Sequence, residues 1–199
     1  GLAGDALTDA DYNVAVGKSA LSSDTLGSRS TAIGTAALNA QNFTSATDSY
    51  NTAVGFYTGL SVTTGTGNTL IGGLAGDAIT TGTNNVALGK SSLSANTTAS
   101  NNTAIGGSAL EANTTGHSNV AVGYEALKTN IDGDGLVAIG YKALNVFEPN
   151  DGLRYTIAIG YEAGLACTQG GDNVFIGGLA GHDVTDGNNN VAIGKNALS

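Results

Sequence analysis

Side chains that could do chemistry are few in this chain, and they lie far apart. There are two histidines, His117 and His182, and one cysteine, Cys167. The histidines sit in different sequence contexts, so we do not expect them to converge on one centre, and no P-loop, zinc-ligand spacing or nucleophile elbow occurs. We therefore predict that the chain is not an enzyme and has no catalytic residue and no cofactor, and we interpret both histidines as solvated turn residues.

One segment imitates the start of a calcium-binding loop. Asn130, Asp132, Asp134 and Gly135 have suitable spacing, but Tyr141 stands where the closing glutamate is expected. We interpret this segment as a plain turn and predict no metal site.

The composition points to a folded chain with few charges. Of 199 residues, 31 are glycine and one is proline, yet 41% are hydrophobic, which is too many for a disordered linker. The net charge of −9 comes with no basic stripe, which disfavours a nucleic-acid partner. No apolar run is long enough for a membrane span, so we expect no membrane insertion in this segment.

A glycine that follows an aliphatic residue recurs eleven times, and eight of the ten intervals are 17 residues long. The eleven marker glycines are Gly17, Gly34, Gly55, Gly72, Gly89, Gly106, Gly123, Gly140, Gly160, Gly177 and Gly194. A fixed period of this kind is the signature of a repeat architecture. Residues 1–199 are thus expected to form a single repeat array, and because it begins and ends inside a repeat we expect it to be an excerpt of a longer protein.

The residues before each marker glycine predict a short strand. With the glycine numbered 0, position −3 is β-branched and position −1 is Val, Ile or Leu in all eleven repeats, while position −2 is Ala in nine, Leu70 and Phe175 being the exceptions. Position −4 is Asn in eight repeats. In stacked coils about 4.8 Å apart, these amides would form a hydrogen-bonded ladder.

Two later positions compensate each other in volume. Position +4 is Leu in seven repeats and Gly in four. In those four, position +7 is apolar: Val62, Ile79, Cys167 and Val184. This indicates a packed core whose volume is kept, and it makes Cys167 a core residue.

Together these features predict an all-β protein, a parallel β-roll or β-solenoid of about eleven 17-residue coils. Successive strand residues point to opposite faces, and both faces here are apolar. We expect the face with the β-branched residues to be core. The face with Ala at position −2 would then pack closely against another copy, and a trimer is the natural expectation; a monomeric solenoid is the alternative.

Two intervals are longer than 17 residues, and both expand in the turn region. They predict loop insertions near 42–50 and 148–155. Loops on rigid scaffolds commonly carry recognition. The candidate surface-contact residues are Phe43, Tyr50, Phe147, Arg154 and Tyr155. Aromatic residues at positions +1 and +2 could stack on sugars, but we favour a role in shielding the edge of the coil.

The motif Asn-[Val/Thr]-Ala-[Ile/Val]-Gly-x-x-Ala-Leu, as in residues 119–127, resembles the head repeats of trimeric autotransporter adhesins of the YadA type. Residues 102–119 look still more like a variant found in phage tail fibres. The resemblance covers residues 13–198, and it implies a left-handed trimeric β-roll. It also implies an extracellular location, on a virion or on a bacterial cell surface or outer membrane.

These observations favour a structural and adhesive segment of an extracellular fibre, with a cell-surface glycan or protein as the candidate receptor. The alternative is a monomeric β-solenoid that binds polysaccharide or ice, for which Thr at position +8 gives a regular array in eight repeats. An enzyme such as a polysaccharide depolymerase lacks the carboxylate cluster that it would need.

Overall fold

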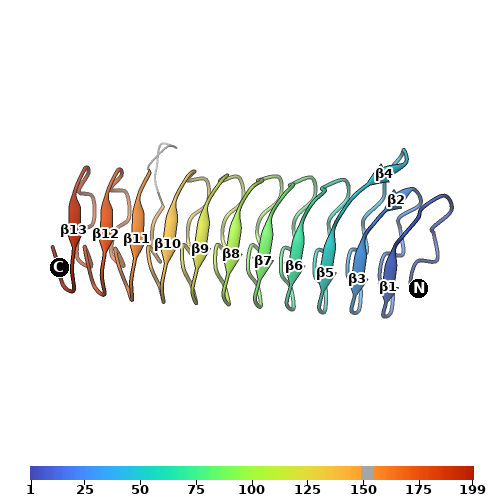
Figure 1. The fold of residues 1–199 in the computed structure, drawn as a ribbon, viewed down its shortest axis with the longest axis horizontal. Helices are drawn as coiled ribbons and strands as arrows, with labels where there is room; N and C mark the ends of the chain where they lie inside the picture. The colour runs from blue at the N-terminus through green and yellow to red at the C-terminus, as the bar shows by residue number, and fades with distance from the viewer. Residues whose placement is uncertain (149–154) are drawn as a thin grey trace.

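Each sequence repeat forms one coil of a parallel β-solenoid in the computed structural model, which describes residues 1–148 and 155–199 (Figure 1). The coils stack in a row, with the two termini at opposite ends of the rod. No helix occurs in these two ranges, and thus none that is long and apolar enough to cross a membrane. The predicted fold class, an all-β parallel solenoid of 17-residue repeats, is confirmed.

One short strand per coil joins an eleven-stranded parallel sheet. Its strands are β1 (Val14–Val16), β3 (Thr31–Ile33), β5 (Thr52–Val54), β6 (Thr69–Ile71), β7 (Val86–Leu88), β8 (Thr103–Ile105), β9 (Val120–Val122), β10 (Val137–Ile139), β11 (Ile157–Ile159), β12 (Val174–Ile176) and β13 (Val191–Ile193). Equivalent positions pair throughout, as Val86 does with Thr103. A second sheet pairs β2 (Gly27–Ser28) with β4 (Thr47–Asp48), which lies at the first insertion.

The marker glycine ends each strand because no other residue fits there. Gly72 has a φ of 130°, a conformation that L-residues rarely adopt. A Cβ atom on Gly72 would also lie 2.6 Å from the carbonyl oxygen of Gly89 in the next coil. The glycine therefore meets a local backbone requirement and the spacing between coils at once.

The asparagines at position −4 link each coil to the next. The Asn68 side chain donates to the carbonyl oxygen of Gly82 at 2.9 Å, and its Oδ1 accepts from the backbone N–H of Asn85 at 3.0 Å. The same pair of bonds is made by Asn13, Asn51, Asn68, Asn85, Asn102, Asn119 and Asn173. The predicted ladder is confirmed, but its shorter bonds run to the backbone. Direct amide-to-amide bonds, such as that from Asn85 to Asn68 at 3.2 Å, are added to these.

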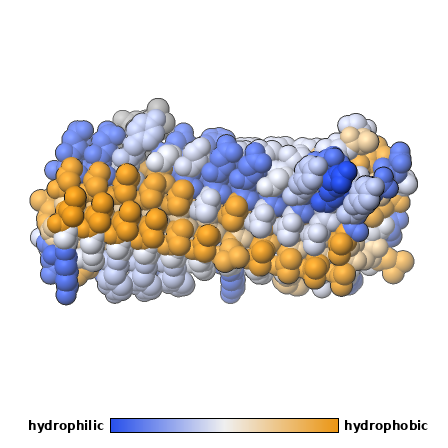
Figure 2. Space-filling model, viewed as in Figure 1, coloured by the Kyte–Doolittle hydropathy of each residue, from blue (hydrophilic) through white to orange (hydrophobic). Residues whose placement is uncertain are grey.

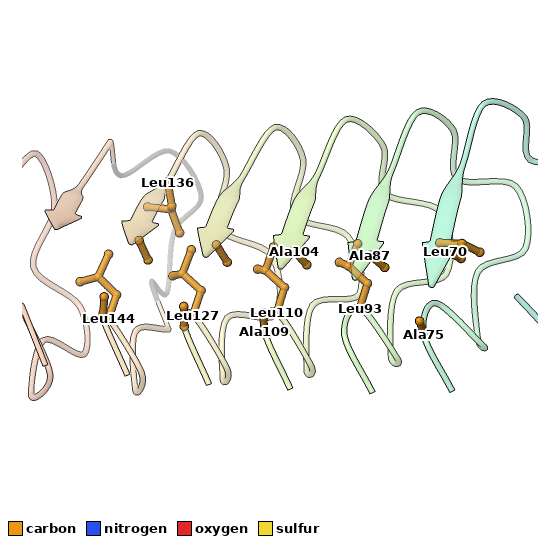
Figure 3. Close-up of a cluster of buried hydrophobic side chains, with 14 of the residues drawn as sticks. Leu70, Ala75, Ala87, Leu93, Ala104, Ala109, Leu110, Leu127, Leu136 and Leu144 are labelled. Atoms are coloured by element: carbon orange, nitrogen blue, oxygen red, sulfur yellow. The ribbon is translucent and has the colours of Figure 1, made fainter. Parts of the chain in front are cut away.

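Most of the side chains that fill the coils come from positions −2, +3 and +4, and apolar residues at position +7 and Leu136 at position −4 add to them (Figure 3). Ala104 at position −2, Ala109 at +3 and Leu110 at +4 are all fully buried. The expectation that the Ala face meets another copy is therefore wrong. The coil is narrow, and because Leu projects inward from one side, only a small side chain fits opposite it in most coils.

The volume compensation between positions +4 and +7 is confirmed, and it extends to position −2. Leu70, one of the two large residues at −2, lies between Gly59 and Gly76: a Cβ atom on either glycine would come within 2.9 Å of a Leu70 methyl group. Phe175 is flanked in the same way by Gly164 and Gly181. The four Gly coils are thus two pairs, each of which makes room for one large side chain.

Position +4 also has a backbone constraint. Leu110 has a φ of 51° and Gly76 a φ of 56°. A β-branched side chain would be strained in this left-handed region, which explains why the position alternates between Leu and Gly and never holds Val or Ile.

Polar residues at position +7 are also buried, and apart from Gln41, which bonds to Asp24, Ser30 and Asn51, each bonds to the backbone of its own turn. The Asn96 side chain donates to the carbonyl oxygen of Ala99 at 3.1 Å and accepts from its N–H at 3.1 Å. Asn130 makes the same pair of bonds with Gly133. Position +7 therefore faces inward whether it is polar or apolar, and the asparagines there close the following turn.

Removal of one ladder side chain should destabilise the solenoid. Asn102→Ala would leave the N–H of Asn119 without its acceptor, and the carbonyl oxygen of Gly116 would keep only its bond from the Asn113 side chain. Because both groups are buried, we expect a loss of about 2–5 kcal/mol in the free energy of unfolding. Urea unfolding followed by circular dichroism measures it, with the exposed Thr98→Ala as control. Equal stability of the two variants would contradict the role given to the ladder.

Large residues at positions −2 and +4 should be mutually exclusive. We expect Gly76→Leu to destabilise the protein, because its new side chain would overlap Leu70 and Ile79. The double variant Gly76→Leu/Leu70→Ala should recover part of this loss, with a coupling energy of about 1–3 kcal/mol in a double-mutant cycle. Additive effects of the two substitutions would show that the sites do not share one space.

Candidate functional site

The most extensive candidate surface is a band of apolar side chains along the outer face of the eleven-stranded sheet. We call it the apolar stripe and define it as the side chains at positions −3 and −1 of the eleven coils. Since position −2 points into the coil, these two positions point outward. Leu88, in the middle of the rod, is 43% exposed. Figure 2 shows the stripe as a continuous orange band from one end of the rod to the other.

The stripe widens toward the C-terminal end. Position −3 is Thr in β3, β5, β6 and β8, but Val or Ile in every strand from β9 to β13. Figure 2 accordingly shows a broader band over the C-terminal coils, on the left. The expectation that the β-branched face is core is wrong for the isolated chain, in which one coil encloses only its position −2 side.

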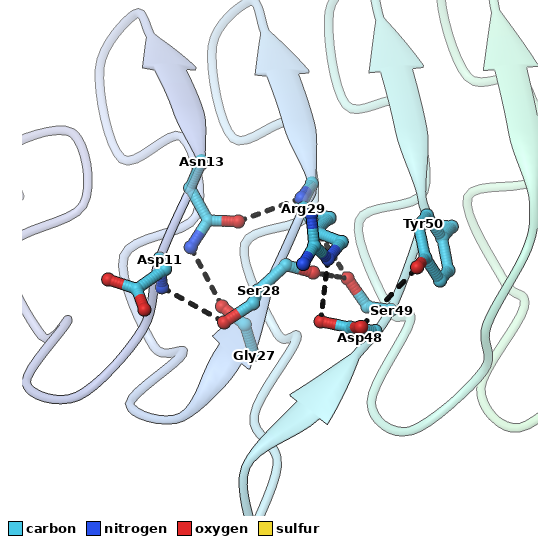
Figure 4. Close-up of polar contacts among 9 residues, drawn as sticks. Asp11, Asn13, Gly27, Ser28, Arg29, Asp48, Ser49 and Tyr50 are labelled. Atoms are coloured by element: carbon cyan, nitrogen blue, oxygen red, sulfur yellow. Dashed lines mark hydrogen bonds and ion pairs between the residues drawn. The ribbon is translucent and has the colours of Figure 1, made fainter.

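One rim of the stripe carries an aromatic and cationic cluster near the first insertion (Figure 4). Arg29 Nε lies 2.9 Å from Asp48 Oδ1, and the guanidinium carbon lies 4.8 Å from the centre of the Tyr12 ring and 6.0 Å from that of Tyr50. The hydrogen bond and charge of Asp48 raise the pKa of Arg29 above its ordinary value. Tyr12, Arg29 and Tyr50 share position −5, a regularity that is visible in the sequence and that we did not predict from it.

The opposite rim carries a ladder of three stacked tyrosines at position +1. The ring centres of Tyr124 and Tyr141 are 5.7 Å apart, those of Tyr141 and Tyr161 are 5.3 Å apart, and the ring planes differ by 15° and 10°. Glu125 beside the ladder pairs with Lys128 at 3.0 Å. The hydrogen bond from Lys128 is the main cause that lowers the pKa of Glu125.

Two of the predicted contact residues are exposed, and two are not. Tyr50 is 60% and Tyr155 57% exposed. Phe43 and Phe147 are buried, so their prediction as surface-contact residues is wrong. Phe147 occupies position +7, which faces the core, and its sequence position could have shown this. Arg154 lies outside the described residues.

Phe43 is buried because its ring packs over the backbone of an earlier coil. A Cβ atom on Gly27 would lie 2.7 Å from this ring. The backbone N–H of Phe43 donates to Asp24 Oδ1 at 3.3 Å. The first insertion thus places one aromatic residue inward, at Phe43, and one outward, at Tyr50.

The titratable residues considered for catalysis or metal binding take part in contacts between or within coils. His117 Nδ1 accepts from the backbone N–H of Ser100 at 3.0 Å, and the backbone N–H of His117 donates to Asp134 Oδ1. His182 lies beside Asp183. Among the residues that the structure describes, no group of three or more His, Cys, Asp and Glu side chains could hold a metal ion, and no pocket is present.

The threonines at position +8 form an internal ladder. The hydroxyl of Thr63 donates to the carbonyl oxygen of Thr80 at 3.1 Å, and Thr80 donates to that of Thr97 at 3.0 Å. Thr8, Thr97, Thr114 and Thr168 make the equivalent bond. These hydroxyl groups therefore donate their protons to the backbone of the next coil. This argues against ice binding, which would depend on a regular array of hydroxyl groups that face the ice.

Comparison with known proteins identifies no relative: no family model, curated protein or solved structure matches the chain. The similarity to adhesin and tail-fibre repeats therefore rests on the repeat motif alone.

Cys167 should be unreactive in the native protein. It is fully buried, its Sγ–H donates to the carbonyl oxygen of Gly170 at 3.5 Å, and burial raises the pKa of its thiol from 9.0 to about 11. Because the thiolate is the nucleophile, we expect a thiol reagent at pH 8 to label the protein only as fast as it unfolds. Rapid labelling of the folded protein would contradict this assignment.

The same raised pKa predicts a pH dependence of stability. The unfolded chain loses the thiol proton near pH 9, whereas the folded chain holds it to about pH 11. The free energy of unfolding should therefore fall as the pH rises from about 9 to about 11. Cys167→Val removes the titrating group and introduces the residue that another coil has at this position, Val62. The stability difference between wild type and Cys167→Val should change across this range, and a constant difference would contradict the buried thiol.

Proposed function

We propose that this chain is a structural and adhesive segment of an extracellular fibre. Parallel copies would pack along the apolar stripe as a homotrimer and present attachment sites for a host or another surface. The apolar stripe carries the proposal. It is about 50 Å long and about 7 Å wide between its two rows of Cα atoms. Exposed apolar patches of a few hundred Å² commonly mark interaction surfaces.

A second copy of the chain is the partner that fits the stripe best. The side chains repeat at the coil spacing of about 4.8 Å over the whole length of the rod. A partner with the same spacing and length can bury all of them in register, and a further copy of this chain has both. A parallel arrangement also matches the wide end of one stripe with the wide end of the other.

The composition of the stripe and its rims agrees with such an interface. The stripe consists of Val, Ile, Leu and Thr and contains no charged residue. Tyrosine and arginine, which are enriched in interfaces, stand on the rims at Tyr12, Arg29 and Tyr124. The net charge of −9 makes copies repel one another at long range, so burial of the stripe must supply the attraction.

The proposed number of chains, three, and the proposed extracellular location come from the resemblance to adhesin and tail-fibre repeats. A cyclic trimer would turn the three stripes toward a common axis. The exposed Tyr50 and Tyr155, at the ends of the two insertions, are the candidate contacts for a cell-surface glycan or protein. A rigid rod suits this role, because loops on rigid scaffolds commonly carry recognition.

A charge in the middle of the stripe should break the assembly without unfolding the coil. We expect the wild type to have a solution mass of about three times 19.5 kDa, the mass of one chain. Leu88→Asp should give single chains, because three carboxylates would be buried near one axis. Light scattering coupled to size-exclusion chromatography measures both masses.

The matched control is Thr98→Asp. Thr98 belongs to the same coil as Leu88 but lies in the exposed turn, so the variant adds the same charge away from the stripe. It should keep the wild-type mass. A wild type of single-chain mass would contradict the fibre proposal and favour a monomeric solenoid that binds a polysaccharide along the stripe or the tyrosine ladder.

A further inference from the structure

The tyrosine ladder stops at Tyr161, where the next coil leaves an open place. We propose that this place binds one neutral pyranose ring of a glycan, which would stack on Tyr161 above Gly178. The inference deepens the proposed attachment role and rests on it, because it names a ligand class for the fibre.

Three coils have glycine at position +1, and they differ in what lies above that glycine. At Gly107 the Tyr124 ring already covers the space, with a ring carbon 3.5 Å from where a Cβ atom would stand. At Gly73 the neighbouring aromatic, Phe56, is already stacked on Tyr57 with ring centres 3.9 Å apart. At Gly178 no atom lies within 4 Å of the Cβ position. Gly178 is therefore the place where a stacked ring can be added.

The exposure of the three rings agrees with a free ring face at each end of the ladder, Tyr161 included. The middle residue, Tyr141, is 40% exposed, whereas Tyr124 is 51% and Tyr161 is 55% exposed. Tyr141 has a ring on each side. The next coil after Tyr161 has Gly178 at position +1 and therefore no side chain at that position. The neighbouring rings are spaced 5.3 and 5.7 Å apart, and Lys195 holds position +1 one coil beyond Gly178. One flat ring therefore fits between Tyr161 and the Lys195 coil.

The open surroundings favour a sugar ring over other flat ligands. The part of the chain that the structure describes contains no pocket, so this place lies open on the surface. A ligand bound there keeps most of its edge in water. A pyranose ring keeps its hydroxyl groups solvated while its C–H face covers the apolar face of the tyrosine. Two exposed polar side chains on the adjoining turn, Lys195 and Asn196, are available to hydroxyl groups. The acidic chain, with Glu162 beside Tyr161, disfavours an anionic sugar.

Binding of cellotetraose tests the proposal, because β-linked glucose has C–H groups on both faces of its ring. Saturation-transfer and chemical-shift NMR would follow the tyrosine ring signals; the chain has no tryptophan. We expect Tyr161 to shift most and Tyr161→Ala to weaken binding by about tenfold. Gly178→Tyr, whose Cβ atom would meet no atom within 4 Å, should extend the ladder, keep the fold and also abolish binding.

The matched control is Tyr124→Ala, at the other end of the ladder, where the Tyr124 ring itself lies over Gly107; this variant should bind as the wild type does. Equal loss in Tyr124→Ala and Tyr161→Ala, or unchanged binding in Gly178→Tyr, would overturn the proposal. So would binding of p-cresol, a mimic of a tyrosine side chain, with no binding of cellotetraose. Leu88→Asp separates the two proposals, since it lies on β7 and should change the mass while it leaves sugar binding intact.

Discussion

The asparagine ladder is the interaction on which the stacking of the coils depends. Backbone hydrogen bonds join each coil to the next in the turns as well as in the three-residue strand, as the bond from the N–H of Leu74 to the carbonyl oxygen of Phe56 does at 3.0 Å. Each ladder asparagine adds two, one to a carbonyl oxygen and one from an N–H of the next coil, as Asn102 does with Gly116 and Asn119. Since these groups are buried, the amide both links the coils and removes the cost of unpaired polar groups. It also fixes the register, because a slip of one residue would move the amide away from both partners.

The narrow interior is the second constraint, and it determines which residues face outward. A coil that encloses Leu110 can accept only Ala104 opposite it, and a coil that encloses Leu70 or Phe175 requires glycines around that side chain. The β-branched side chains at positions −3 and −1 suit the strand conformation but find no room inside. They therefore form an apolar surface along the rod, and from this surface we infer that the chain associates with copies of itself.

The sequence was sufficient to predict the repeat, the strand, the ladder and the compensation between positions +4 and +7, because each follows from a regularity that the stacking multiplies. The sequence was not sufficient to predict which face of the strand points into the coil, because Ala and the β-branched residues are both apolar. Only the width of the coil decides which of these side chains is enclosed. Phe147 could have been placed correctly, because Val62 and Ile79 at the same position had already been identified as core. Phe43 could not, because its burial over Gly27 depends on the path of an insertion that has no counterpart in other repeats. The open place at Gly178 likewise depends on the direction in which the tyrosine rings stack.

Small-angle X-ray scattering of the wild-type protein tests most directly whether copies cover the apolar stripe, because it reports length, thickness and mass together. Parallel packing along the stripe predicts a particle of about 50 Å in length, the length of one solenoid, with the mass of about three chains and a correspondingly thicker cross-section. A particle of the same length with the mass and thickness of one chain would show that no copy covers the stripe. A longer particle would equally contradict parallel packing, because end-to-end association would leave the stripe exposed.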